Sequence, residues 1–91
     1  MPQPDGFALH EAYPNPFNPT TSLSFTIPEA MKVNLTVYDV SGRTVATVVN
    51  GFRQAGSHDV TFDASQLSSG LYFYTLNAGE FSTSGKMVLV K

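Results

Sequence analysis

Apolar and polar residues alternate over several short segments of this 91-residue chain, and the alternation constrains the fold more than any other feature. Over residues 22–27 the apolar positions are Leu23, Phe25 and Ile27, and the same period of two recurs over residues 33–38 and 58–63. Successive side chains of a β-strand point to opposite faces, so such segments are half-buried strands. The chain is therefore predicted to be built from strands.

Turn signals separate these strands. We expect turns at residues 28–29, 39–43, 50–51 and 78–80, with Gly42 at a positive φ angle and Asn50-Gly51 as a hairpin signal. The predicted strands cover residues 7–11, 22–27, 33–38, 44–49, 58–62, 71–77 and 81–91. Residues 63–67 are expected to form one helical or 3₁₀ turn capped by Asp63. About seven short strands at this spacing predict an all-β fold, an immunoglobulin-like antiparallel β-sandwich.

The strand over residues 71–77 differs from the others because residues 71–76 are apolar or aromatic on both faces. Such a strand is expected to be covered from both sides. The exposed-aromatic alternative places Tyr38, Tyr72 and Tyr74 on an outer surface, where they form a platform for a sugar ring. Ordinary packing in the core is the favoured interpretation of these tyrosines.

A proline-rich loop precedes the strands: Tyr13, Pro14, Asn15 and Pro16 begin the sequence Tyr-Pro-Asn-Pro-Phe-Asn-Pro over residues 13–19. Each proline fixes its own φ and disfavours helix at the preceding residue, while asparagine side chains bond nearby backbone in turns. The loop is predicted to be a stiff, non-helical corner with Tyr13 and Phe17 packed beneath it. A docking surface is the alternative.

Composition excludes several classes of function. A net charge of −2 lacks the basic surface of a nucleic-acid-binding protein, so no nucleic acid partner is expected. No apolar run approaches the roughly 20 residues of a membrane helix, so no membrane span is expected. The chain has no cysteine. Residues 1–8 are interpreted as a linker and residues 9–91 as one domain, with any export signal of a larger protein lying upstream.

The sequence offers no catalytic or cofactor site. Ser57, His58 and Asp59 are the residue types of a catalytic triad, but neighbours in a strand point to opposite faces and cannot assemble one. His58 shares a face with apolar neighbours and is interpreted as an edge or core histidine. Three aspartates could be considered as calcium ligands, namely Asp39, Asp59 and Asp63. They lack the dense run of oxygen ligands that a calcium-binding loop supplies. We therefore expect no enzyme activity, no metal and no cofactor.

Four motifs in a fixed order resemble a known family. They lie at residues 13–19, 37–43, 69–74 and 86–91, the last being a strand with lysines at both ends. Together they resemble the C-terminal sorting domain (type A) of type IX secretion cargo over residues 9–91. The resemblance implies a domain that directs an N-terminal passenger from the periplasm of a Gram-negative bacterium through the outer-membrane translocon. A sortase-like peptidase then typically removes the domain, and the passenger is anchored to the cell surface or released.

The resemblance also assigns residues. Gly70, Leu71, Tyr72, Lys86 and Lys91 match the family's recognition motifs, with the two lysines expected to contact the translocon. The other matches are structural: Asp39, Gly42 and Arg43 form the central turn, with Asp39 and Arg43 bracing it by a charged hydrogen bond, and Tyr13, Pro14, Asn15 and Pro16 form the entrance loop. On physical grounds alone, Lys86 and Lys91 discourage edge-to-edge pairing of the last strand. The alternative function is an immunoglobulin-like accessory module that binds a neighbouring domain or a polysaccharide.

Overall fold

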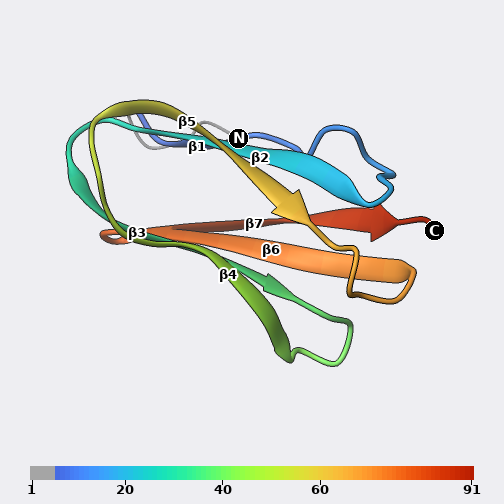
Figure 1. The fold of residues 1–91 in the computed structure, drawn as a ribbon. Helices are drawn as coiled ribbons and strands as arrows, with labels where there is room; N and C mark the ends of the chain where they lie inside the picture. Colours follow the sequence, from blue (N-terminus) through green and yellow to red (C-terminus); the bar gives the residue numbers. More distant parts are fainter. Residues whose placement is uncertain (1–5) are drawn as a thin grey trace.

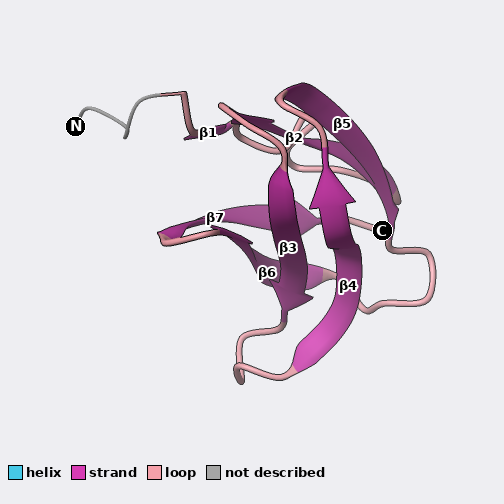
Figure 2. Ribbon diagram, turned by 90° about the vertical axis from the view of Figure 1, so that its left-hand side faces the viewer, coloured by secondary structure: helices cyan, strands magenta, loops and turns pink. Residues whose placement is uncertain are grey.

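Seven strands and no helix make up the fold in the computed structural model, which describes residues 6–91. The strands are β1 (Ala8–Leu9), β2 (Thr20–Ile27), β3 (Met31–Tyr38), β4 (Thr44–Arg53), β5 (Gly56–Asp63), β6 (Gly70–Ala78) and β7 (Phe81–Leu89). They form two antiparallel sheets, in the orders β1-β2-β5 and β4-β3-β6-β7, which lie one above the other (Figures 1 and 2). The predicted all-β sandwich is confirmed.

The core lies between the two sheets and is built by the alternation. In β2 the residues Leu23, Phe25 and Ile27 are buried, while the residues between them are partly exposed. β3 contributes Val33 and Leu35 from the facing sheet. Burial of such side chains contributes roughly 1.5–3 kcal/mol each to folding, so the sheets are held together mainly by this layer.

The turn between β3 and β4 is organised by Asp39. Its Oδ1 accepts hydrogen bonds from the backbone N–H of Ser41 at 2.9 Å, the hydroxyl of Ser41 at 2.6 Å and the backbone N–H of Arg43 at 3.0 Å. The guanidinium of Arg43 contributes less, because its Nε lies 4.0 Å from Asp39 Oδ2 and its side chain is exposed. Gly42 has a φ of 88°, as the sequence predicted.

Because of this turn, the stability of the fold is expected to depend on pH. The hydrogen bonds from the Ser41 side chain and then the Arg43 backbone lower the pKa of Asp39. A carboxyl group with a lowered pKa in the folded state stabilises the fold above about pH 4, and this contribution is lost as the pH falls through its folded-state pKa. Asp39→Asn is expected to lower the thermal midpoint at pH 7, with a deficit that shrinks toward pH 3. Thermal unfolding of both proteins across this pH range measures the difference, and a deficit independent of pH would contradict the assignment.

The predicted turn at Asn50-Gly51 is wrong. β4 runs through both residues to Arg53, and the chain reverses at residues 54–55 instead. Asn50 pairs with Asn34 and Gly51 with Val33 on β3. The long ladder with β3 therefore prevails over the local hairpin signal, and Gly51, with a φ of 150°, serves a strand rather than a hairpin turn.

The expectation that both faces of the strand over 71–77 are covered is also wrong. Tyr72 and Tyr74 point into the core, whereas Leu71 and Phe73 are each 37% exposed on the outer face of β6. The sugar platform that included Tyr72 and Tyr74 is thereby excluded, and core packing of these two tyrosines is confirmed. β6 obeys the same alternation as the other strands, with apolar residues at its outward positions.

Most strand boundaries differ from those expected by a few residues. β1 is confined to Ala8–Leu9, and β7 ends at Leu89 rather than Lys91. Over residues 63–67, where one helical or 3₁₀ turn was expected, there is a single turn closed by an i→i+3 hydrogen bond of the 3₁₀ type, from the N–H of Leu67 to the carbonyl of Ala64 at 2.9 Å. Asp63 does accept the N–H of Ser65 at 2.9 Å. The predicted division between a linker over residues 1–8 and a domain over residues 9–91 stays a prediction, because residues 1–5 lie outside the part that the structure describes. Within the described part, Ala8 pairs with Thr26 of β2.

Candidate docking surface at the C-terminal strand

The proline-rich loop lies along the outer edge of β7. The N–H of Phe17 donates to the carbonyl of Val88 at 2.9 Å, and the N–H of Val90 donates to the carbonyl of Phe17 at 2.9 Å. The Asn15 side chain continues this pairing: its Oδ1 accepts the N–H of Val88 at 2.9 Å, and its Nδ2 donates to the carbonyl of Lys86 at 3.2 Å. The loop, blue in Figure 1, therefore covers the edge that β7 would otherwise leave open over residues 86–90.

Only one aromatic residue of the loop packs beneath it. Phe17 is 2% exposed, with its ring centroid 6.3 Å from that of Phe62, as predicted. The same prediction for Tyr13 is wrong, because its side chain is 80% exposed. The backbone of Tyr13 instead forms a bridge with Ser22, and the carbonyl of Pro14 accepts the hydroxyl of Thr21 at 2.8 Å. The loop is thus fastened to β2 as well as to β7.

The five predicted recognition residues lie close together at one end of the sheet, but they present different groups. Gly70 pairs with Leu89, Leu71 with Val88 and Tyr72 with Met87 across β6 and β7. Tyr72 is buried, and its hydroxyl donates to the carbonyl of Ser68 at 2.7 Å, so it serves packing in the isolated domain. Leu71, Lys86 and Lys91 reach solvent.

The two lysines are not equivalent. The side chain of Lys86 has no hydrogen-bond or ion-pair partner among residues 6–91 of the structure. Lys91 is bound at two points, by its N–H to Ser69 Oγ at 3.0 Å and by Nζ to the carbonyl of Ser65 at 2.8 Å. Lys86 is therefore the more available ammonium group for a partner.

Three exposed apolar residues beside them were not identified from the sequence: Phe73, Val88 and Val90. Phe73 lies directly opposite Lys86 on the outer face of the sheet. We call the C-terminal patch the six residues Leu71, Phe73, Lys86, Val88, Val90 and Lys91. The alternation along β6 could have identified Phe73 as an exposed residue. If Tyr72 and Tyr74 point into the core, the residue between them must point outward. An exposed group of apolar residues rimmed by charge is typical of an interaction site.

A hollow lies between the loop and the middle of β7, lined by Glu11, Asn15, Tyr74, Ser84, Gly85 and Lys86. The Tyr74 hydroxyl accepts the N–H of Ala12 at 3.0 Å and lies 3.4 Å from the carbonyl of His10. Burial raises the pKa of Tyr74, and the charge of Glu11 adds to that shift. Tyr74 thus joins the segment just before the loop to the core beneath β7.

The triad residue types lie as the alternation predicted. Asp59 accepts the hydroxyl of Ser24 at 2.5 Å, whereas His58 stacks on Phe25 and its Nε2 lies 2.7 Å from the carbonyl of Gln54. Among residues 6–91 no three His, Cys, Asp or Glu side chains gather as metal ligands. In the same range the structure contains no helix long and apolar enough to cross a membrane.

A small β-sandwich that presents exposed apolar residues and two lysines along and beside its last strand has the kind of surface with which domains bind other proteins. Residues 11–91 match the family described as the secretion system C-terminal sorting domain, so the chain belongs to this family. It is a sorting signal of type IX secretion, which implies interaction with that machinery and export to the cell surface or the medium. The family is not one of enzymes. A comparison with curated proteins found no match.

Proposed function

We propose that this domain directs a passenger fused to its N-terminus from the periplasm through the outer-membrane translocon, and that the C-terminal patch is the surface the translocon recognises. A sortase-like peptidase then cuts at or before residues 1–8, and the passenger is anchored at the surface or released. The single observation that supports the sorting role is the family match over residues 11–91. The role of the C-terminal patch in recognition is supported by its exposed position at the last strand, among residues that match the family's recognition motifs.

Docking onto the outer face is the mode of contact that the geometry favours. Addition of a partner strand to β7 would need the free edge of that strand. Over residues 86–90 this edge is already bonded to Asn15 and Phe17. The side chains of Leu71, Phe73 and Val88 are open to a partner without any displacement.

Deleting the last strand would not test this proposal, because Phe81, Met87 and Leu89 belong to the core and the domain would unfold. Charge reversal at Lys86 is a more specific test, because it changes an exposed side chain and leaves the core intact. In a host with a working type IX system, Lys86→Glu in a passenger fusion is expected to reduce export at least about fivefold, because a contact with an acidic partner becomes repulsive. The measurement is fluorescence of the passenger in the medium and at the cell surface.

Lys32→Glu is the matched control, since Lys32 is an exposed lysine on the same face of the same sheet, at its other end. It is expected to export normally, and both purified domains should retain the wild-type thermal midpoint. Normal export of Lys86→Glu would exclude the charge role. Equal losses in both variants would show that only total charge matters, and the patch would then not be the recognised surface.

A further inference from the structure

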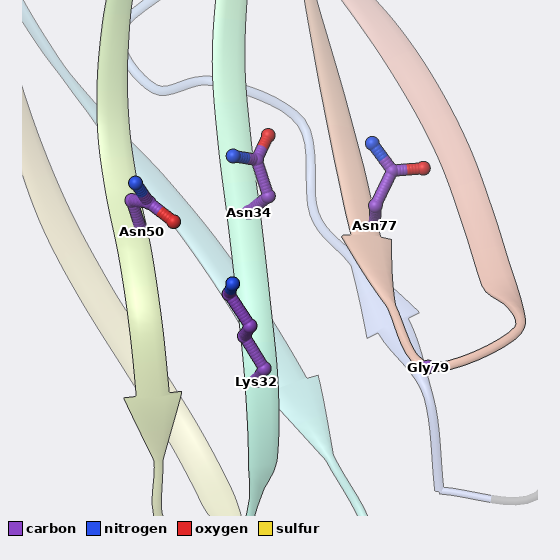
Figure 3. Close-up of a pocket in the computed structure, with 5 residues that line it drawn as sticks. All are labelled: Lys32, Asn34, Asn50, Asn77 and Gly79. Carbon is purple, nitrogen blue, oxygen red and sulfur yellow. The ribbon is translucent and has the colours of Figure 1, made fainter.

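Three asparagines lie side by side on the outer face of the four-stranded sheet, away from the C-terminal patch. Asn50 on β4, Asn34 on β3 and Asn77 on β6 are direct cross-strand neighbours, and their carboxamides project together (Figure 3). With Lys32 and Gly79 they line a shallow groove of about 410 Å³, which we call the asparagine groove. This volume falls in the range of roughly 300–1,000 Å³ for ligand pockets.

The groove is rich in hydrogen-bond donors and has no carboxylate in its lining. Each carboxamide offers two N–H donors and one carbonyl, and Lys32 adds an ammonium group. One acceptor is already used, because Asn34 Oδ1 accepts the hydroxyl of Thr36 at 2.5 Å. The four strands of this sheet contain the charged residues Lys32, Arg53 and Lys86 and no acidic one. The groove is thus complementary to a ligand with many oxygen acceptors and a negative charge.

An exposed aromatic side chain lies next to the groove. Phe52 is 70% exposed and stands directly opposite Lys32 across β4 and β3. It is two residues from Asn50, so both side chains share the outer face. An apolar ring beside polar groups matches a pyranose, which has an apolar ring face and a polar rim of hydroxyls.

We propose that the asparagine groove and Phe52 bind a carboxylated saccharide, with the sugar ring on Phe52, its hydroxyls on the carboxamides and its carboxylate at Lys32. This is a second activity, separate from sorting, which gives the domain affinity for acidic polysaccharide. Glu80 follows Gly79 in the β6–β7 turn and is exposed, so it places one negative charge near the end of the groove. Its removal strengthens binding.

Titration of the whole 91-residue chain with tetragalacturonic acid, followed by NMR, tests the proposal, and maltotetraose serves as the uncharged comparison. Binding is expected to shift the side-chain amide signals of Asn50 and Asn77. Phe52→Ala and Asn77→Ala each weaken binding about 2- to 10-fold, as expected for the loss of one contact. Glu80→Gln is expected to bind more tightly.

Ser82→Ala is the matched control, because Ser82 pairs with Asn77 in the same row but lies outside the groove lining. It should bind like the wild type. Absence of binding at roughly millimolar saccharide would overturn the proposal. So would equal affinity for maltotetraose, or equal losses in Asn77→Ala and Ser82→Ala. Thermal midpoints of all variants separate a lost contact from a lost fold.

Discussion

Phe17→Ala is expected to lower the free energy of unfolding by about 3–5 kcal/mol, the range for removing a buried phenylalanine ring. Phe17 is 2% exposed and contacts the core through Phe62. Its backbone also holds the outer edge of β7 through Val88 and Val90. Since a domain of this size has only about 5–14 kcal/mol in total, this loss brings it close to unfolding. Urea unfolding followed by circular dichroism measures the change.

Tyr13→Ala is the matched control, because Tyr13 is the other aromatic residue of the same loop and is 80% exposed. Its substitution should change stability by no more than about 0.5 kcal/mol. In the fraction of the Phe17→Ala variant that remains folded, the amide hydrogen of Val90 should exchange with solvent faster than in the wild type, because this amide donates to the carbonyl of residue 17. A loss below about 1 kcal/mol would show that the ring does not anchor the loop.

The strands were predictable because the alternation of Leu23, Phe25 and Ile27 is a local property of the chain that burial alone explains. The hairpin signal at Asn50-Gly51 failed because both residues are already paired with β3, the strand that precedes β4 in the chain. β3 extends far enough for Met31 to pair with Arg53, and its ladder carries β4 beyond the signal. Local turn propensity decides a structure only where no longer ladder competes with it.

The candidate site was predicted in part. The resemblance identified Leu71, Lys86 and Lys91, which the structure brings to one surface, but it also assigned Tyr72, whose ring is buried. The pairing of Phe17 with Leu89 could not be predicted, because a parallel bridge between the two ends of the chain leaves no periodic signal in the sequence. The asparagine groove was not predicted either. It forms only when β3, β4 and β6 align in register, and single asparagines in strands carry no such information.

Gly85→Ala is expected to destabilise the domain by about 3 kcal/mol, at the upper end of the usual cost of overpacking. A Cβ atom at this position would lie 2.6 Å from both Cζ and the hydroxyl oxygen of Tyr74. The ring cannot move aside cheaply, because its hydroxyl accepts the N–H of Ala12 at 3.0 Å and the ring is part of the core. β7 must therefore shift away from β6, which disturbs the C-terminal patch. Urea unfolding measures the stability, and export of a passenger fusion measures the patch.

Two further variants distinguish the clash between residue 85 and Tyr74 from a general effect of changing a side chain on β7. Ser84→Ala alters the neighbouring exposed residue and should leave stability within about 0.5 kcal/mol of wild type. Tyr74→Leu removes the atoms that a new Cβ would meet, so Gly85→Ala should cost much less in that background than in the wild type. Equal costs in both backgrounds would rule out the contact with Tyr74 as the reason for glycine at this position. A smaller cost in the Tyr74→Leu background would show that glycine at position 85 makes room on β7 for the ring of Tyr74, whose hydroxyl binds Ala12 just before the proline-rich loop.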